Sequence, residues 1–160
     1  MLSVTVACVG KLKESYWREA CAEYQKRLSA FCRLQIVEVA EERLPDDPSA
    51  AQIDAALDAE GQRLLSRIPA GAAVVALCFE GKEMPSEALS RQMTQWTVDG
   101  VSHVVFVIGG SFGLSDAVKR EARLRLSFSP MTFPHQLARI LVLEQVYRAF
   151  HIASGGKYHK

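Results

Sequence analysis

Three continuous apolar stretches constrain this fold more than any other feature of the chain. They cover residues 2–9, 72–79 and 101–108, and their only polar residues are Ser3, Thr5, Ser102 and His103. A strand with such a pattern is buried on both faces, which is typical of parallel sheets covered by helices on each side. The stretches therefore predict the centre of a parallel sheet.

Helical patterns separate these stretches and two shorter predicted strands at 34–39 and 124–129. The predicted helices cover 14–31, 49–68, 85–98, 116–123 and 134–153, the second of them opened by a capping box at Ser49 and Gln52. Strict β-α alternation predicts an α/β fold with a mostly parallel sheet sandwiched by helices. With 160 residues, no linker and no repeat, residues 1–160 are predicted to form a single domain.

Ligands of such sheets bind beyond the carboxyl ends of the strands. In the second half of the chain these ends lead into loops at 78–84, 109–114 and 129–133. The second loop carries Gly109, Gly110 and Gly113, but its spacing is neither a dinucleotide fingerprint nor a phosphate loop. The third contains Pro130 and lies just before Pro134, so its extended backbone can face a flat ring such as adenine. Ordinary strand-to-helix turns remain an alternative for both.

The C-terminal quarter favours an anionic partner. Residues 38–60 carry eight acidic side chains and one basic, whereas residues 119–160 carry eight basic and two acidic. His135 and Arg139 share one face at the start of the last helix, where anions are attracted, and Glu144 and Arg148 are also four residues apart. Solvated helix faces and a simple ion pair are the alternatives. That helix is apolar on almost every side, which indicates burial against the sheet and a second subunit.

The last residues of the chain are basic and aromatic, so they can stack on a base and contact phosphate, or simply fray. Four cysteines form no Cys-x-x-Cys pair, and with no signal peptide or membrane span we expect free thiols in the cytoplasm. The four histidines lack the spacing of a zinc site, so we expect no metal.

Seven short motifs are spread along the chain: VGKLK at 9–13, EYQKRL at 23–28, EGQR at 60–63, FVIGGS at 106–111, MTFPHQ at 131–136, EQVYRAF at 144–150 and YHK at 158–160. Together they resemble the RlmH-type ribosomal RNA methyltransferases of the SPOUT superfamily. The resemblance covers essentially the whole chain and departs at no motif position.

The resemblance implies a deep trefoil knot in the C-terminal half, a rare exception to unknotted topology. It also implies a homodimer that binds S-adenosylmethionine and methylates N3 of a pseudouridine in helix 69 of 23S rRNA, within the assembled ribosome. The implied cofactor contacts are Leu77, Gly109, Phe128, Ser129, Pro130, Met131, Thr132 and Phe133.

Methylation at N3 requires that the imide proton be removed or the anion stabilised. We expect His135 or His159 to take part in proton transfer, Arg139 to contact phosphate or the developing anion, and Tyr158 to stack on the base. The expected RNA contacts are Arg139, Lys157, Tyr158, His159 and Lys160.

Two other functions remain open at this stage. A non-catalytic ribosome-binding factor explains the basic C-terminal quarter equally well, but it has no need of ligand loops. A flavodoxin-like nucleotide-binding protein fits the β-α order. However, the first strand is followed by Gly10, Lys11, Leu12 and Lys13 rather than by a loop rich in hydroxyl groups and glycine.

Overall fold

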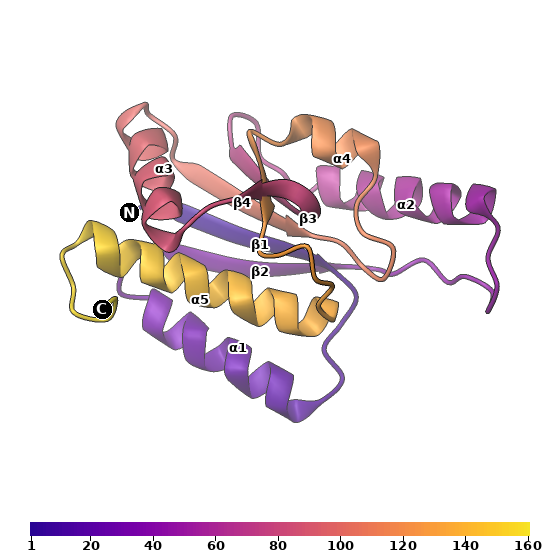
Figure 1. Ribbon diagram of the computed structural model, residues 1–160, viewed down its shortest axis with the longest axis horizontal. Helices are drawn as coiled ribbons and strands as arrows, with labels where there is room; N and C mark the ends of the chain where they lie inside the picture. The colour runs from indigo at the N-terminus through magenta and orange to yellow at the C-terminus, as the bar shows by residue number, and fades with distance from the viewer.

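Five parallel strands form one sheet in the order β2-β1-β4-β3-β5 in the computed structural model, which describes residues 1–160 (Figure 1). Their bounds are β1 Ser3–Val9, β2 Arg33–Val39, β3 Ala73–Glu83, β4 His103–Ile108 and β5 Leu124–Ser127. The order jumps from β1 to β4, so the two halves of the chain meet along the middle of the sheet.

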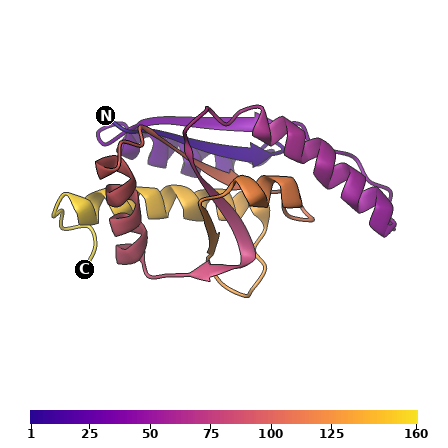
Figure 2. The same cartoon turned by 90° about the horizontal axis from the view of Figure 1, so that it is seen from above.

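Helices cover both faces of this sheet (Figures 1 and 2). One layer holds α1 (Ser15–Leu28), α3 (Ser86–Val98) and α5 (His135–Ala153), and the other holds α2 (Ala50–Leu65) and α4 (Asp116–Glu121). The α/β fold with a parallel sheet between helices is therefore confirmed. The trefoil knot stays a prediction.

Side chains of the central strands alternate between two separate hydrophobic clusters. Val4 and Val6 of β1 join Phe106 of β4 beneath α1, α3 and α5. Ala7 of β1 and Val107 of β4 face α2 and α4 instead. All of these side chains are almost completely buried, which explains why the strands read as continuous apolar stretches.

The third strand departs from its predicted bounds. It was expected to end at Phe79 but continues to Glu83, and its pairing with β5 shifts register between Leu77 and Lys82. Gly81 permits this second contact, because a Cβ there would lie 2.7 Å from the carbonyl oxygen of Arg125. Part of the predicted 78–84 loop is therefore strand.

Smaller differences concern the helix ends and the thiols. The helices α1, α2 and α4 end two or three residues before their predicted ends, whereas the capping box at Ser49 and Gln52 is present. All four cysteines are free, and burial raises the pKa of Cys8 to about 12. None of the helices has both the length and the apolar character that crossing a membrane requires.

Close packing of α2 on the start of α4 depends on Gly61. A Cβ at this position would overlap Ser115 Oγ and would lie 3.3 Å from Val118 Cγ2. Ser115 is the N-cap of α4, and its hydroxyl accepts a hydrogen bond from Val118 N. The glycine thus positions the helix that follows the 109–114 loop.

Gly61→Ala should destabilise the protein by about 1–3 kcal/mol, although alanine is the better helix former, because the added methyl overpacks this contact. Urea unfolding measures the change. Ser115→Ala removes the cap at a cost of about 1 kcal/mol and also removes the overlapping hydroxyl. The double variant should therefore lose less stability than the two single losses combined. A loss of stability in the double variant equal to the sum of the two single losses would contradict this packing.

Candidate functional site

The carboxyl ends of β4, β3 and β5 lie side by side at one edge of the sheet, because these strands are neighbours and all parallel. Large apolar side chains are exposed at this edge, with Met131 at 74% exposure as the extreme case. The others are Phe79 in β3 and Phe112 and Phe133 on the loops. Exposed apolar groups gathered in this way mark a surface that a ligand or partner covers.

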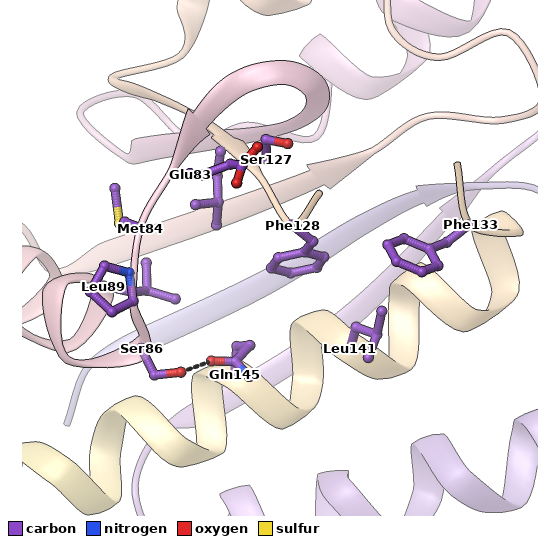
Figure 3. Close-up of a pocket in the computed structure, with 11 residues that line it drawn as sticks. Glu83, Met84, Ser86, Leu89, Ser127, Phe128, Phe133, Leu141 and Gln145 are labelled. Atoms are coloured by element: carbon purple, nitrogen blue, oxygen red, sulfur yellow. Dashed lines mark hydrogen bonds between the residues drawn. The ribbon is translucent and has the colours of Figure 1, made fainter. Parts of the chain in front are cut away.

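A cavity of about 620 Å³ lies between this edge and the helices α3 and α5. Phe128 and Phe133 lie above Leu141 of α5, and Ser86 of α3 meets Gln145 of α5 at one end (Figure 3). The remaining lining residues are Glu83, Met84, Pro85, Leu89, Leu126 and Ser127. Its size and its mixture of aromatic and polar groups suit a small organic ligand.

Two serines shape the loop that bears the aromatic residues. Ser127 Oγ donates to the carbonyl of Phe79 at 2.9 Å and accepts from Ser129 N at 3.2 Å. Ser129 Oγ accepts from Met131 N at 3.0 Å. The backbone N–H groups of Phe128 and Phe133 donate to no group in the chain. Free donors beside aromatic rings are able to recognise a flat heterocycle.

The glycine loop after β4 is tightly folded. A Cβ on Gly109 would overlap the carbonyl group of Gly113, so only glycine fits there. Gly113 itself has φ of 87°, in the region that favours glycine. The pattern that suggested a ligand loop is thus also required by the turn itself.

The predicted cofactor residues meet at this edge but contact the cavity unequally. Phe128 and Phe133 line it, whereas Leu77 and Gly109 lie in and just after the neighbouring strands, outside its lining. The remaining predicted cofactor residues are half-buried or exposed on the 129–132 segment outside it: Ser129, Pro130, Met131 and Thr132.

The tail is docked rather than frayed. Tyr158 donates to Glu144 Oε1 at 2.7 Å, and Arg148 binds the same carboxylate at 2.8 and 3.2 Å. His159 Nδ1 lies 3.0 Å from Arg148 Nη1, and His159 Nε2 lies 2.7 Å from Glu87 Oε1 in α3. We call these five residues the tail network. Its presence confirms the predicted pairing of Glu144 with Arg148.

The tail network adjoins the cavity. Ser86 Oγ donates to Gln145 Oε1 at 2.6 Å at the cavity end, and Gln145 Nε2 donates to Glu144 at 3.1 Å. Glu87 follows Ser86 in the first turn of α3. Both ribbon views place the chain end beside this turn and the end of α5 (Figures 1 and 2). The cavity and the tail thus form one continuous region.

Hydrogen bonds set the pKa values in the tail network. The hydrogen bond that Tyr158 donates to the Glu144 carboxylate raises the pKa of Tyr158 to about 12. Burial would raise the pKa of Glu144, but the hydrogen bonds from Arg148 and Tyr158 outweigh it and lower that pKa. The hydrogen bond from His159 lowers the pKa of Glu87. Both carboxylates are therefore charged at neutral pH.

The structure does not bring His135 and Arg139 together with the tail. His135 is half-buried at the first position of α5, about 14 Å of helix rise from Glu144. Arg139 is only 3% exposed and donates to Glu38 at 2.8 Å and to the carbonyl of Gly10 at 3.2 Å. Within one chain Arg139 thus joins the start of α5 to β1 and β2.

The basic C-terminal quarter is partly neutralised by ion pairs. Lys119 pairs with Glu80, as Arg139 and Arg148 pair with the glutamates described above. Exposed basic side chains without a carboxylate partner are Arg120, Arg123, Arg125, Lys157 and Lys160. These are the groups available to a polyanion.

A second cavity of about 630 Å³ lies on the other side of the glycine loop, against the 41–48 segment. Glu41, Glu42, Asp46 and Glu60 line it against only two basic residues, Lys13 and Arg43. Burial raises the pKa of Glu60.

Across the chain, no group of three or more His, Cys, Asp or Glu side chains is placed to hold a metal ion.

Sequence reasoning missed three residues of this region. Glu87 has the pattern of an ordinary acidic residue in a first helical turn, and Ser86 and Gln145 carried no motif that pointed to each other. Glu87 lies 72 positions from His159 and Ser86 lies 59 from Gln145, so no local pattern predicts these contacts.

Known proteins provide an independent comparison. The family model described as "Predicted SPOUT methyltransferase" matches residues 2–159. A protein of Bifidobacterium animalis subsp. lactis, named ribosomal RNA large subunit methyltransferase H, is 48% identical over 159 residues, which cover 99% of this chain and 100% of that protein. Proteins of the same name from Leuconostoc mesenteroides and Streptococcus thermophilus are 45% and 46% identical with the same coverage.

Docking of the tail should depend on pH. Because the hydrogen bonds that Tyr158 and His159 of the docked tail donate contribute to the lowered pKa values of Glu144 and Glu87, docking is favoured above the ordinary glutamate pKa of about 4.3 and is lost as pH falls through the lowered values. Amide NMR shifts of Lys157 to Lys160 measure the transition, with β1 and β4 amides reporting the fold.

Glu144→Gln should release the tail already at neutral pH, whereas Glu121→Gln, at the exposed end of α4, should not. If the amide chemical shifts of the tail in the wild-type protein at pH 7 match those of a free peptide, the docked tail is contradicted.

Proposed function

The chain belongs to the SPOUT methyltransferase family, and we propose that it transfers the methyl group of S-adenosylmethionine to ribosomal RNA of the large subunit. The observation that carries this proposal is the cavity at the carboxyl ends of β3 and β5, which adjoins the docked tail. A ligand cavity beside a tail bearing His159 suits group transfer better than simple binding.

The finer proposal is that the target is N3 of a pseudouridine in helix 69 of 23S rRNA, in the assembled ribosome. It rests on the resemblance of the C-terminal motifs, and the exposed basic groups described above support an RNA partner. The four free cysteines favour action in the reducing cytoplasm.

The residues at the sheet edge fit S-adenosylmethionine. Phe128 and Phe133 offer apolar surface to a purine ring, and their free backbone N–H groups are suited to its edge. When bound, this cofactor supplies an activated methyl group, so positioning and exclusion of water are the main demands on the protein. The exposed Met131 and Phe79 provide apolar groups that exclude water once they are covered.

In this proposal a histidine removes the imide proton. His159 or His135 accepts the proton, Tyr158 stacks on the base, and Lys157 and Lys160 contact phosphates. Arg139 meets phosphate or the developing anion only if its ion pair with Glu38 opens. While that pair holds, Arg139 keeps the start of α5 in place.

A homodimer is part of the proposal. Only five residues of the 19-residue helix α5 are buried within one chain. Apolar side chains that stay half-buried on this helix, outside both the core cluster and the cavity lining, are Leu137 and Ile152. A second copy covering α5 would bury them, and it would also enlarge the surface that meets a ribosomal stem-loop.

The decisive experiment measures transfer of labelled methyl from S-adenosylmethionine to ribosomes that lack the modification, followed by nuclease mapping. We expect label on a helix 69 pseudouridine. Cofactor binding without transfer would mean a different substrate. Neither binding nor transfer would favour a non-catalytic ribosome-binding factor.

The histidine variants test the base assignment at saturating cofactor. His159→Ala or His135→Ala should reduce turnover about 100-fold, the lower end of what a general base contributes. His103→Ala is a control, because His103 lies at the opposite end of β4 and hydrogen-bonds Thr5. Wild-type turnover in both test variants would rule out a histidine base.

Sedimentation measures the oligomeric state. We expect a mass near twice 17.7 kDa, and Leu137→Glu or Ile152→Glu should shift it towards the monomer by placing charge in the interface. Glu121→Lys on α4 is a control for surface charge. A monomer that is stable to dilution and fully active would contradict the dimer.

A further inference from the structure

Both ring nitrogens of His159 are engaged by charged neighbours. Arg148 Nη1 lies 3.0 Å from Nδ1, and Glu87 Oε1 lies 2.7 Å from Nε2. An arginine guanidinium has only donors, so Nδ1 must offer its lone pair to it. The ring proton therefore resides on Nε2 and is donated to Glu87. The contacts select one neutral tautomer.

Glu87 contributes more to this geometry than to stability. Its side chain is 46% exposed, and such an ion pair at a surface adds little to the free energy of folding. Its position in the first turn of α3 directs the carboxylate at the imidazole. A carboxylate that accepts Nε2–H leaves Nδ1 as the basic nitrogen, which is how bases are oriented in catalytic dyads.

Arg148 can leave Nδ1 without losing its own partner. Its Nε and Nη2 groups both bind Glu144, at 3.2 and 2.8 Å, so only Nη1 needs to move. Tyr158 also donates to Glu144 Oε1 of the same carboxylate. A substrate N–H group of similar geometry is thus able to replace Nη1 at His159.

We propose that Glu87 is a positioning residue for methyl transfer: it holds His159 in the Nε2–H tautomer, so that Nδ1 accepts the imide proton of the target base. This inference rests on the proposed function and on His159 as the base. The N3–H bond breaks as the Nδ1–H bond forms, and the N3 electron pair forms the new bond to the methyl carbon. The bond from that carbon to the sulfonium sulfur breaks at the same time, and its electron pair stays on the sulfur of the thioether that leaves. The imidazolium that results is stabilised by Glu87 and returns its proton to water.

A series of hydrogen bonds between the tail and the cavity supports this role. Ser86, next to Glu87, lines the cavity and binds Gln145, which in turn binds Glu144. The carboxylate, the imidazole and the cavity end therefore share one hydrogen-bonded framework. No other acidic side chain contacts His159.

The test combines a spectroscopic and a kinetic measurement. In protein labelled with ¹⁵N-histidine, long-range ¹H–¹⁵N NMR reports the tautomer of His159, assigned with His159→Asn. We expect the Nε2–H form in the full-length protein and a mixture of tautomers in Glu87→Ala. With modification-deficient ribosomes, kcat of Glu87→Ala should fall about tenfold or more, while the Kd for S-adenosylmethionine stays unchanged.

Glu87→Asp should restore part of the tautomer preference and part of kcat, because it keeps a carboxylate at the same helix position. Glu121→Ala is the matched control and should change neither quantity, since Glu121 lies at the exposed end of α4.

Each of three results would overturn the inference: an Nδ1–H tautomer in the wild-type protein, an unaltered tautomer in Glu87→Ala, or wild-type kcat in Glu87→Ala. If the wild type transfers no methyl, the proposed function fails. If His159→Asn keeps full turnover, only the assignment of His159 as the base fails. In either case the catalytic part of this inference fails with it. The NMR measurement would then still show, independently of activity, whether Glu87 sets the tautomer of His159.

Discussion

The side chains of β1 and β4 alternate between two hydrophobic clusters, one under α1, α3 and α5 and the other under α2 and α4. Burial on both faces leaves these strands no exposed surface on which a ligand could bind. Chemistry is therefore confined to the sheet edges and to the loops that leave them. Because all strands are parallel, the loops of β4, β3 and β5 emerge at the same edge of the sheet, where exposed aromatic and thioether groups lie.

The loops at this edge owe their conformations to local requirements. The carbonyl of Gly113 occupies the space where Gly109 would carry a Cβ, and Ser127 links the end of β5 to Phe79 at the bulge of β3. These constraints place Phe128 and Phe133 over α5 and leave backbone donors free beside them. A preformed cavity of this kind lowers the ordering cost of binding.

The last helix connects the cavity to the chain end. Its buried side anchors it on the sheet, with Arg139 held by Glu38, while its other side carries Glu144, Gln145 and Arg148. The tail folds back onto these polar groups and reaches α3 through His159. A segment whose composition suits disorder is thereby ordered by a few charged hydrogen bonds, which are strong where they are partly shielded from water.

The sequence by itself determined the α/β fold, the strand and helix order, the capping box at Ser49 and the loops that bear the cavity, because these follow from periodicity and local turn chemistry. The motifs of the resemblance also identified the family. Only the tertiary structure decided that β3 continues past Phe79, that Arg139 is buried against Glu38, and that the tail docks on Glu87. Each of these depends on a contact between residues distant in the chain, whose free energy exists only once the sheet and α5 have brought the partners together.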